Sequence, residues 1–443
     1  MTSLRPLVGV LVCVSLLTAA PSRADVTTDW NVITTNTIGA VTPSRLIEIT
    51  MVHLAMHDAI QSIQHRFETY SSGLAPGSGS EIAAAATAAR DVLIKLFPGS
   101  SAAVETTYLT YLQDNRLTTS DPGVAAGQRA AAAIIQNRAG DGSYPVPSPT
   151  FFGGTRPGEW RPTVLSPTGE PTSMTTPWLA TMRTFAVTHS SQMFSSAPPR
   201  LTSRRYTRDY NEVKALGRNV GSSRTPEQTA LAVFYIENAV VYWNRTLRSL
   251  TDRYFKDVGE SARLFALVNV AMTDALLTSW QSKIQYNFWR PITAIQLGDS
   301  DGNRSTVGDP TWQPLYPTPN YAEYNSGALG LAGAAAEMLK LFFRTDRVNF
   351  SVMGVFGSRD YTRFSDAATD ISEARIYEGI HFRSADLAGR SAGQRISRWA
   401  YKHYLRSLDG DDFDFVRSLD SLEDLGDFDM DEDDGQDDED AEQ

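Results

Sequence analysis

The chain has 443 residues, of which 42% are hydrophobic and 10% aromatic. This composition suits one large core or two moderate ones and excludes a fibrous or wholly disordered protein. The net charge of −11 is unevenly distributed, because residues 408–443 hold eighteen Asp and Glu against Arg417 alone, a net −17, which leaves +6 for residues 1–407. A mildly basic body suits a small anionic ligand, and it lacks the basic and aromatic stripe of a nucleic-acid-binding protein.

The sequence predicts that the two ends of the chain do not belong to the folded part. Residues 1–24 have the pattern of a signal peptide, with Arg5, an apolar stretch over residues 7–20 and a small-x-small cleavage site at residues 22–24. The apolar stretch is too short for a comfortable membrane span. We therefore expect a secreted or periplasmic protein without a membrane span, and the mature chain has no thiol because Cys13 lies in the signal peptide. Residues 408–443 are expected to be a disordered acidic tail.

The remaining chain reads as helical. Apolar residues recur at helical spacing in residues 47–60. Further helices are expected at 80–97, 101–116, 121–137, 205–217, 226–248, 259–288, 326–344, 361–374 and 381–406. Turn-rich connections are expected at 140–177 and 297–319, and Asp299–Asn303 is read as a turn because it lacks the distal glutamate of a calcium loop. No strand-like alternation is long enough to predict a sheet.

Four side chains allow more than one interpretation. His53 and His57 have the i, i+4 spacing of a helix-borne metal pair, but packing inside a helix is favoured because no third ligand is visible. Trp160 is more simply a structural residue of its connection than part of a substrate entrance. Asp274 either orients a cation or is a solvated surface acid.

The stretch around which the chain is organised is Lys283–Pro291, KIQYNFWRP. On a helix, the step of seven residues from Lys283 to Arg290 is about two turns, so both cations would leave the same face, and Pro291 would end or kink the helix. We expect these two cations to point at one anion.

Two later fragments supply further groups for an anion. Ser326 and Gly327 precede an apolar run of small residues, which predicts a helix whose first turn offers a hydroxyl and free backbone N–H groups. Arg375 and His381 are six residues apart, so they converge only if the helix breaks between them, and Gly379 is the expected break. Together the three fragments predict a site for a tetrahedral oxyanion.

The order Lys-x6-Arg-Pro, Ser-Gly, Arg-x5-His resembles that of the vanadium-dependent haloperoxidases and the related type 2 phosphatidic acid phosphatases. The motifs at Phe288–Ile295, Asp309–Trp312 and Gly379–Arg383 are more similar to those of the bacterial haloperoxidases than to those of the phosphatases. The resemblance implies an all-α fold of two helical bundles, residues 25–200 with a long irregular connection and residues 201–407 with the anion site. A homo-oligomer is compatible with the sequence.

The resemblance also implies the roles of the residues. Vanadate would be attached through His381, while Lys283, Arg290, Ser326, Gly327 and Arg375 would neutralise and hydrogen-bond its oxygens. Hydrogen peroxide would bind to the vanadium, Lys283 would polarise the bound peroxide, and a halide would attack it. In the phosphatase branch, the histidine would instead attack a phosphate ester.

One position departs from the family pattern, because Ala328 stands where the family has its acid–base histidine. Loss of such a group typically lowers a rate by about 10² to 10⁴, whereas anion binding by the other side chains would survive. The leading expectation is a haloperoxidase-like enzyme with impaired turnover. The alternatives are an acid-phosphatase-type phosphomonoesterase and a non-catalytic oxyanion-binding protein. Glu323 and His57 are the residues considered as substitutes for the missing histidine.

Overall fold

The computed structural model describes residues 25–39, 42–194, 196–255 and 257–410. The signal peptide expected at residues 1–24 and the acidic tail from residue 411 lie outside the described residues.

The described chain is mostly helical, as predicted. The helices of the N-terminal part are α1 (Val26–Ile38), α2 (Leu46–Gln64), α3 (Glu81–Leu96), α4 (Ser101–Asp114) and α5 (Pro122–Arg138). Those of the C-terminal part are α6 (Arg204–Leu216), α7 (Pro226–Phe234), α8 (Ala239–Tyr254), α9 (Val258–Tyr286), α10 (Pro291–Gln296), α11 (Gly327–Phe343), α12 (Phe364–Glu378) and α13 (Arg383–His403). Short 3-10 turns lie at Pro43–Arg45, Pro98–Ser100, Pro177–Thr181, Ser190–Met193 and Gly298–Ser300.

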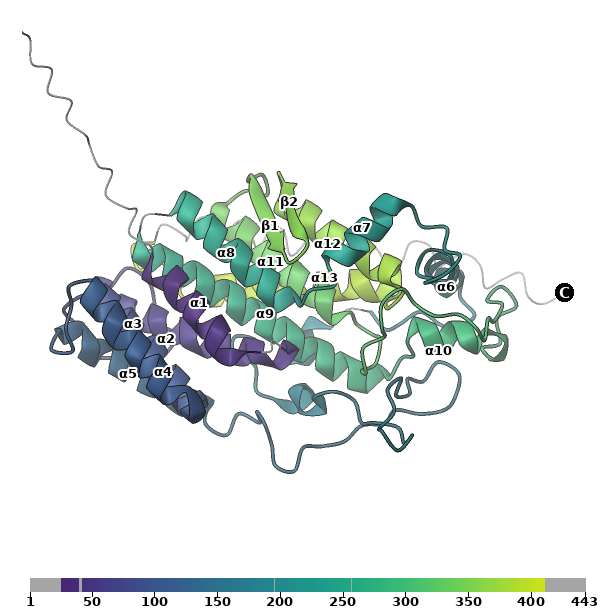
Figure 1. Cartoon of the computed structure of the whole chain (residues 1–443), viewed down its shortest axis with the longest axis horizontal. Coiled ribbons are helices and arrows are strands. Elements are labelled where there is room, and N and C mark those ends of the chain that lie inside the picture. The colour runs from purple at the N-terminus through teal and green to yellow at the C-terminus, as the bar shows by residue number, and fades with distance from the viewer. Residues whose placement is uncertain (1–24, 40–41, 195, 256, 411–443) are drawn as a thin grey trace, which may run out of the picture.

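Helices α1–α5 gather at one end of an elongated molecule, and α6, α7 and α10 lie at the other end (Figure 1). Helix α9 runs between them, and it packs against α2 on one side and α11 and α13 on the other. It has the length and hydropathy of a membrane-crossing helix, and it is the one such helix in the described residues, but its apolar stretch is entirely buried inside the protein. Its all-round apolar surface is therefore explained by its central position.

Small residues hold α11 and α13 backbone to backbone. A Cβ added at Gly389 would lie 2.3 Å from the carbonyl oxygen of Ser326, and one added at Gly393 would lie 2.2 Å from that of Gly330. Such distances exclude any larger residue without movement of a helix. The start of α11, where Ser326 lies, is thereby fixed against the start of α13, which follows His381.

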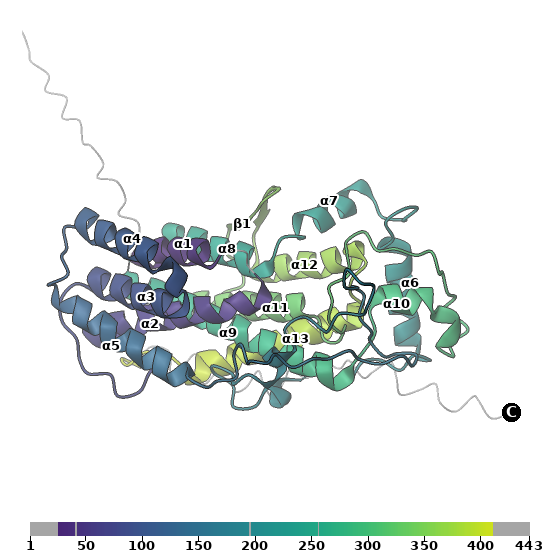
Figure 2. The same cartoon turned by 60° about the horizontal axis from the view of Figure 1, so that its bottom comes forward.

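Two predictions about the elements are wrong. The helix expected over residues 226–248 is two helices, because α7 ends at Phe234 and the Asn238 side chain caps α8 by accepting from the Val240 N–H at 2.9 Å. An antiparallel hairpin, β1 (Phe350–Gly354) and β2 (Gly357–Tyr361), lies where no strand was expected. Strand β1 packs on α8, and one end of the hairpin projects beyond the helices (Figure 2).

The connection between α5 and the turn at Pro177 is irregular, as predicted, and it docks on the end of α9. The Trp160 N–H donates to the Asn287 carbonyl at 2.7 Å, and the Trp289 N–H donates to the Gly158 carbonyl at 2.9 Å. The Trp160 side chain is fully buried. The structural interpretation of this tryptophan is therefore confirmed.

Candidate oxyanion site

Lys283 lies in the last turn of α9 and is completely buried. Its ammonium group donates to the carbonyl oxygens of Ala322 and Glu323, each at 2.8 Å, and to that of Asn325 at 2.5 Å. Burial, and then the nearby Arg290 charge, lower the pKa of Lys283 well below its usual value. Lys283 thus fixes the chain segment just before α11.

Arg290 does not lie on the helix that carries Lys283, so the expected common helix face is wrong. Helix α9 ends at Tyr286 because Asn287 adopts the left-handed conformation (φ 48°), and Arg290 is extended before Pro291 starts α10. The Arg290 Nε donates to the Tyr321 carbonyl at 2.8 Å. The turn nevertheless brings both cations to the 321–325 segment.

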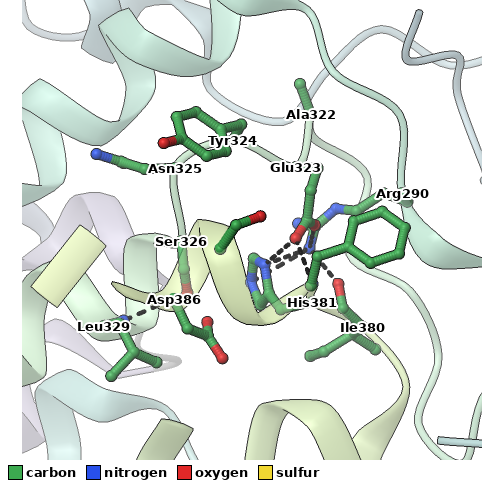
Figure 3. A network of polar contacts seen from close by, with 12 residues as sticks. Arg290, Ala322, Glu323, Tyr324, Asn325, Ser326, Leu329, Ile380, His381 and Asp386 are labelled. Atoms are coloured by element: carbon green, nitrogen blue, oxygen red, sulfur yellow. Dashed lines mark hydrogen bonds and ion pairs between the residues drawn. The ribbon is translucent and has the colours of Figure 1, made fainter. Parts of the chain in front are cut away.

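Glu323 joins Arg290 to His381. The Glu323 Oε2 accepts from Arg290 Nη1 at 3.0 Å, and Oε1 accepts from His381 Nδ1 at 2.9 Å and from the Phe382 N–H at 2.8 Å (Figure 3). Arg290 Nη1 also donates to the Ile380 carbonyl at 2.7 Å and lies 3.2 Å from His381 Nε2. All three side chains are buried. Three chain segments distant in sequence therefore meet at one carboxylate.

Protonation of this cluster follows from burial and charge. Burial lowers the pKa of His381 to about 3, against the opposing effect of Glu323. Burial disfavours the charge on Glu323, but its interactions with His381 and Arg290 outweigh this effect and hold the pKa of this carboxyl below its usual value. At neutral pH His381 is neutral; with its Nδ1 proton donated to Glu323, Nε2 keeps a lone pair.

Ser326 caps α11 as predicted. Its hydroxyl accepts from the Leu329 N–H at 3.4 Å, and Asp386 of α13 accepts from the Ser372 hydroxyl at 3.3 Å. Burial raises the pKa of Asp386 well above its usual value. The predicted break at Gly379 is also confirmed, because this residue ends α12 in the left-handed conformation (φ 79°).

Arg375, on the last turn of α12, is paired with Glu378 at 2.8 Å and donates to the Tyr235 carbonyl. Burial raises the pKa of Glu378 to about 8, and Arg375 opposes this rise. Among the described residues, neither the Arg375 Nε nor the Arg290 Nη2 has a hydrogen-bond partner. Two buried guanidinium groups therefore keep N–H donors for an acceptor.

A cavity of about 290 Å³ lies beside this cluster. It is lined by Gly327, Ala328, Arg375 and His381 from the sequence-predicted fragments. Lys283, Arg290 and Ser326 are not among its lining residues. The ring of Tyr321 lines the cavity and has the Lys283 Nζ 5.2 Å and the Arg290 Cζ 4.7 Å from its centroid. The expected ligands thus fall into two groups. Gly327, Arg375 and His381 line the cavity, whereas the cations of Lys283 and Arg290 lie next to the Tyr321 ring.

The other candidate side chains lie elsewhere. His53 and His57 are buried in α2, where His57 Nε2 lies 3.0 Å from the Glu68 carbonyl. The described residues contain no group of three or more His, Cys, Asp or Glu that could hold a metal ion. Packing is therefore the better interpretation of the histidine pair. His57 is hydrogen-bonded to the chain between α2 and α3, whereas Glu323 is at the candidate site.

Both interpretations of Asp274 are wrong. This carboxylate is buried, and it accepts from the N–H groups of Phe185, Ala186 and Val187 at 2.6, 2.7 and 2.9 Å. It therefore anchors the segment after the turn at Pro177. Burial raises its pKa to about 6.

Sequence reasoning missed Glu378 and Asp386 as members of the cluster. Glu378 stands inside the Arg375–His381 fragment, and Asp386 lies one turn into α13. Their positions close to predicted anion ligands in the sequence could have indicated that they belong to the site. Only the packing of the helices shows that both carboxyls are buried.

Comparisons with known proteins fit this arrangement. Residues 263–410 match the family model of the VCPO second helical-bundle domain. The vanadium chloroperoxidase of Curvularia inaequalis is 29% identical over 187 residues. The C-terminal part of this chain is thus related to the vanadium haloperoxidases. The alignment covers 34% of this chain and 30% of that relative, so the chain matches about a third of the curated protein's length.

Solved structures of vanadium haloperoxidases share the fold over most of the chain. A bacterial vanadium-dependent iodoperoxidase superposes with a TM-score of 0.72 at 20% identity, covering 87% of this chain and 96% of its own. A holo-type bacterial vanadium-dependent chloroperoxidase gives a TM-score of 0.67 at 17% identity, covering 83% and 93%. The all-α fold of the vanadium haloperoxidase type is therefore confirmed.

Proposed function

We propose that this protein binds vanadate at His381 and oxidises halide with hydrogen peroxide, with turnover lowered by Ala328. The observation that carries the proposal is the state of His381. Its Nδ1 is held by Glu323, burial keeps the ring neutral, and the side chain lines the cavity together with Arg375. A neutral imidazole with an unprotonated Nε2 is the form that can act as a ligand, and here this atom lies 3.2 Å from Arg290 Nη1.

The residues present fit a multiply charged oxyanion. The unpartnered donors at Arg290 Nη2 and Arg375 Nε are buried, and a buried N–H without an acceptor is costly. An oxyanion beside His381 would accept from Arg375 at the cavity wall, and a guanidinium group matches its geometry. The backbone N–H groups at the start of α11, next to Gly327, add further donors of partial positive charge.

The residues of the site would have the following roles in vanadate binding. His381 Nε2 would hold the vanadate, while Arg375 and Arg290 would neutralise its charge. Glu323 would keep the proton on His381 Nδ1, and Lys283 would add positive charge from behind the 322–325 segment. Bound vanadate supplies a Lewis-acidic centre at which peroxide is activated towards halide.

Ala328 explains why the rate of turnover would fall while vanadate binding is retained. It lines the cavity with a methyl group, which can neither take a proton from peroxide nor return one. Glu323 does not replace this function freely, because its two oxygens already accept from Arg290, His381 and Phe382.

The test compares vanadate binding in the wild type and in His381→Ala by isothermal titration calorimetry. We expect a loss of affinity of at least about 100-fold, since a ligand and its hydrogen-bond network are removed. His403→Ala is the matched control, because this exposed histidine lies at the end of α13. Unchanged affinity in His381→Ala would refute the site.

Turnover assays then separate the enzyme classes. The wild type should oxidise bromide or iodide with peroxide only when vanadate is added. Hydrolysis of p-nitrophenyl phosphate without vanadate would indicate the phosphatase, and tight vanadate binding with neither activity would indicate an oxyanion-binding protein.

Export is a separate proposal, supported by the signal-peptide pattern of residues 1–24 alone. N-terminal sequencing of protein recovered from the medium or periplasm should begin at Asp25. Full-length protein confined to the cytoplasm would contradict it.

A further inference from the structure

The cavity beside His381 has an aromatic wall that binding of an oxyanion does not require. Its rings are Trp280 of α9, Tyr242 of α8, and Tyr316 and Tyr321 from the connection before α11. Aliphatic side chains complete this wall, with Leu276 and Leu331 on facing helices. Arg375 and His381 lie at its polar part. The cavity thus combines a charged part with a wall of rings.

The rings are held in place by their own contacts. The Trp280 indole N–H donates to the Thr175 carbonyl at 3.1 Å, and its ring centroid lies 4.9 Å from that of Tyr321 at an interplanar angle of 46°. Tyr242 packs edge-on against Tyr235 at 5.5 Å between centroids. Rings fixed in this way offer a preformed surface, so little conformational entropy is lost when a ligand binds.

Ala328 sets the free space in this cavity. It lies on the first turn of α11 between Gly327 and the aliphatic Leu331, all three of which line the cavity. A larger side chain at this position would extend into the same space. The volume of about 290 Å³ compares with an engineered apolar cavity of about 150 Å³ that binds benzene, so one aromatic ring and a small oxyanion fit together.

We propose that the cavity binds a monocyclic aromatic substrate, whose ring lies against the partly exposed Tyr316 and Tyr321, and that Ala328 is the residue that makes room for it. The substrate class rests on the proposed haloperoxidase function, but the binding itself does not. Ala328 then has two consequences: it removes an acid–base group, and it determines which substrate fits the cavity.

The chemistry balances with the reactants of the proposed function. An aryl C–H, halide, hydrogen peroxide and one proton give an aryl halide and two waters. The C–H and O–O bonds break and the carbon–halogen bond forms. Peroxide takes up two electrons, which come from the halide and the ring. A ring held beside His381 would be halogenated where the halide is oxidised.

The test measures the binding of phenol to the vanadate-free protein by isothermal titration calorimetry, with cyclohexanol as the aliphatic probe. We expect phenol to bind more tightly than cyclohexanol. Ala328→Leu should weaken phenol binding at least tenfold by filling the cavity, whereas Ala102→Leu, at an exposed position on α4, should leave it unchanged.

A second variant protects the result against a local folding defect at Ala328. Ile236→Trp changes a partly exposed turn residue that also lines the cavity and should likewise weaken phenol binding. Circular dichroism checks that both variants are folded. Phenol affinity that is unchanged in both variants, or the absence of phenol binding by the wild type, would overturn the proposal.

The outcomes distinguish this inference from the proposed function. Phenol binding that is lost in Ala328→Leu, with no vanadate binding, supports the aromatic site and refutes the haloperoxidase. Vanadate binding and halide oxidation with no phenol binding support the enzyme and overturn the aromatic site.

Discussion

His53 and His381 are both buried, and they differ in what surrounds the ring. His53 in α2 lies 2.8 Å from the Asn31 Nδ2, and His381 lies 2.9 Å from the Glu323 carboxylate. Burial lowers the pKa of each ring to about 3. By burial and pKa alone, the two histidines are equivalent.

Their neighbours separate them. Asn31 also donates to Asn244 at 2.8 Å and accepts from Arg248, while the His53 ring stacks on Phe265 at 4.7 Å between centroids. His53 belongs to a network of amides inside packed helices, which Arg248 joins through Asn31. His381 instead meets a carboxylate, buried guanidinium groups with unpartnered N–H donors, and a cavity. A perturbed pKa therefore indicates a functional site only together with charge and space.

The largest expected effect tests whether the His381 cluster is complete except for its acid–base group. Ala328→His should raise the halide-oxidation kcat by about 10² to 10⁴, because a general acid–base contributes that much. The measurement is steady-state kinetics with vanadate, peroxide and bromide. Ala328→Asn is the control, since it adds a polar group that does not titrate.

The pH dependence of the gain adds a second readout. A rate increase that follows the titration of one added group would support the account. An equal gain in Ala328→Asn, or no gain in Ala328→His, would show that the missing histidine is not what limits turnover.

The second prediction concerns the charge balance of the His381 cluster. Glu323→Ala should lower the free energy of unfolding by about 3 to 5 kcal/mol, because it leaves the buried Arg290 without its partner. Urea denaturation at pH 7 measures this. Glu68→Ala removes the carboxylate of the largely exposed Arg406 pair and should cost less than about 1 kcal/mol. Equal effects would mean that Glu323 is not the partner that stabilises Arg290.

The sequence was a good guide where the local signal and the packing agree. Ser326 before a run of small residues predicted the capped helix α11, and Gly379 predicted the break that brings Arg375 and His381 to one cavity. Both depend on the conformational preferences of single residues, so they are readable without the fold.

The sequence was a poor guide where tertiary contacts override the local pattern. The left-handed turn at Asn287 takes Arg290 off the helix of Lys283, and the hairpin at 350–361 has too short an alternation to be recognised. The partners of Asp274 lie nearly ninety positions away in the chain, so no spacing could indicate its burial. For the same reason, Glu323 could be suspected as a member of the site but not placed there.

The smallest expected effect concerns the other histidine. The pKa of His53 is about 3 when folded and near 6.5 when unfolded, so the unfolded chain binds more protons between these values. Stability that is fully present above pH 6.5 is therefore lost as the pH falls towards 3. At about 1.4 kcal/mol per pH unit, this histidine accounts for roughly 2 kcal/mol between pH 7 and pH 5.

His53→Gln removes this titration and can still accept a hydrogen bond from Asn31. Its free energy of unfolding should therefore fall by roughly 2 kcal/mol less than that of the wild type between pH 7 and pH 5. Urea denaturation at the two pH values measures the difference, and vanadate affinity should not change. A change in vanadate affinity would break the distinction between the two histidines, because it would couple the amide network of α2 to the oxyanion site.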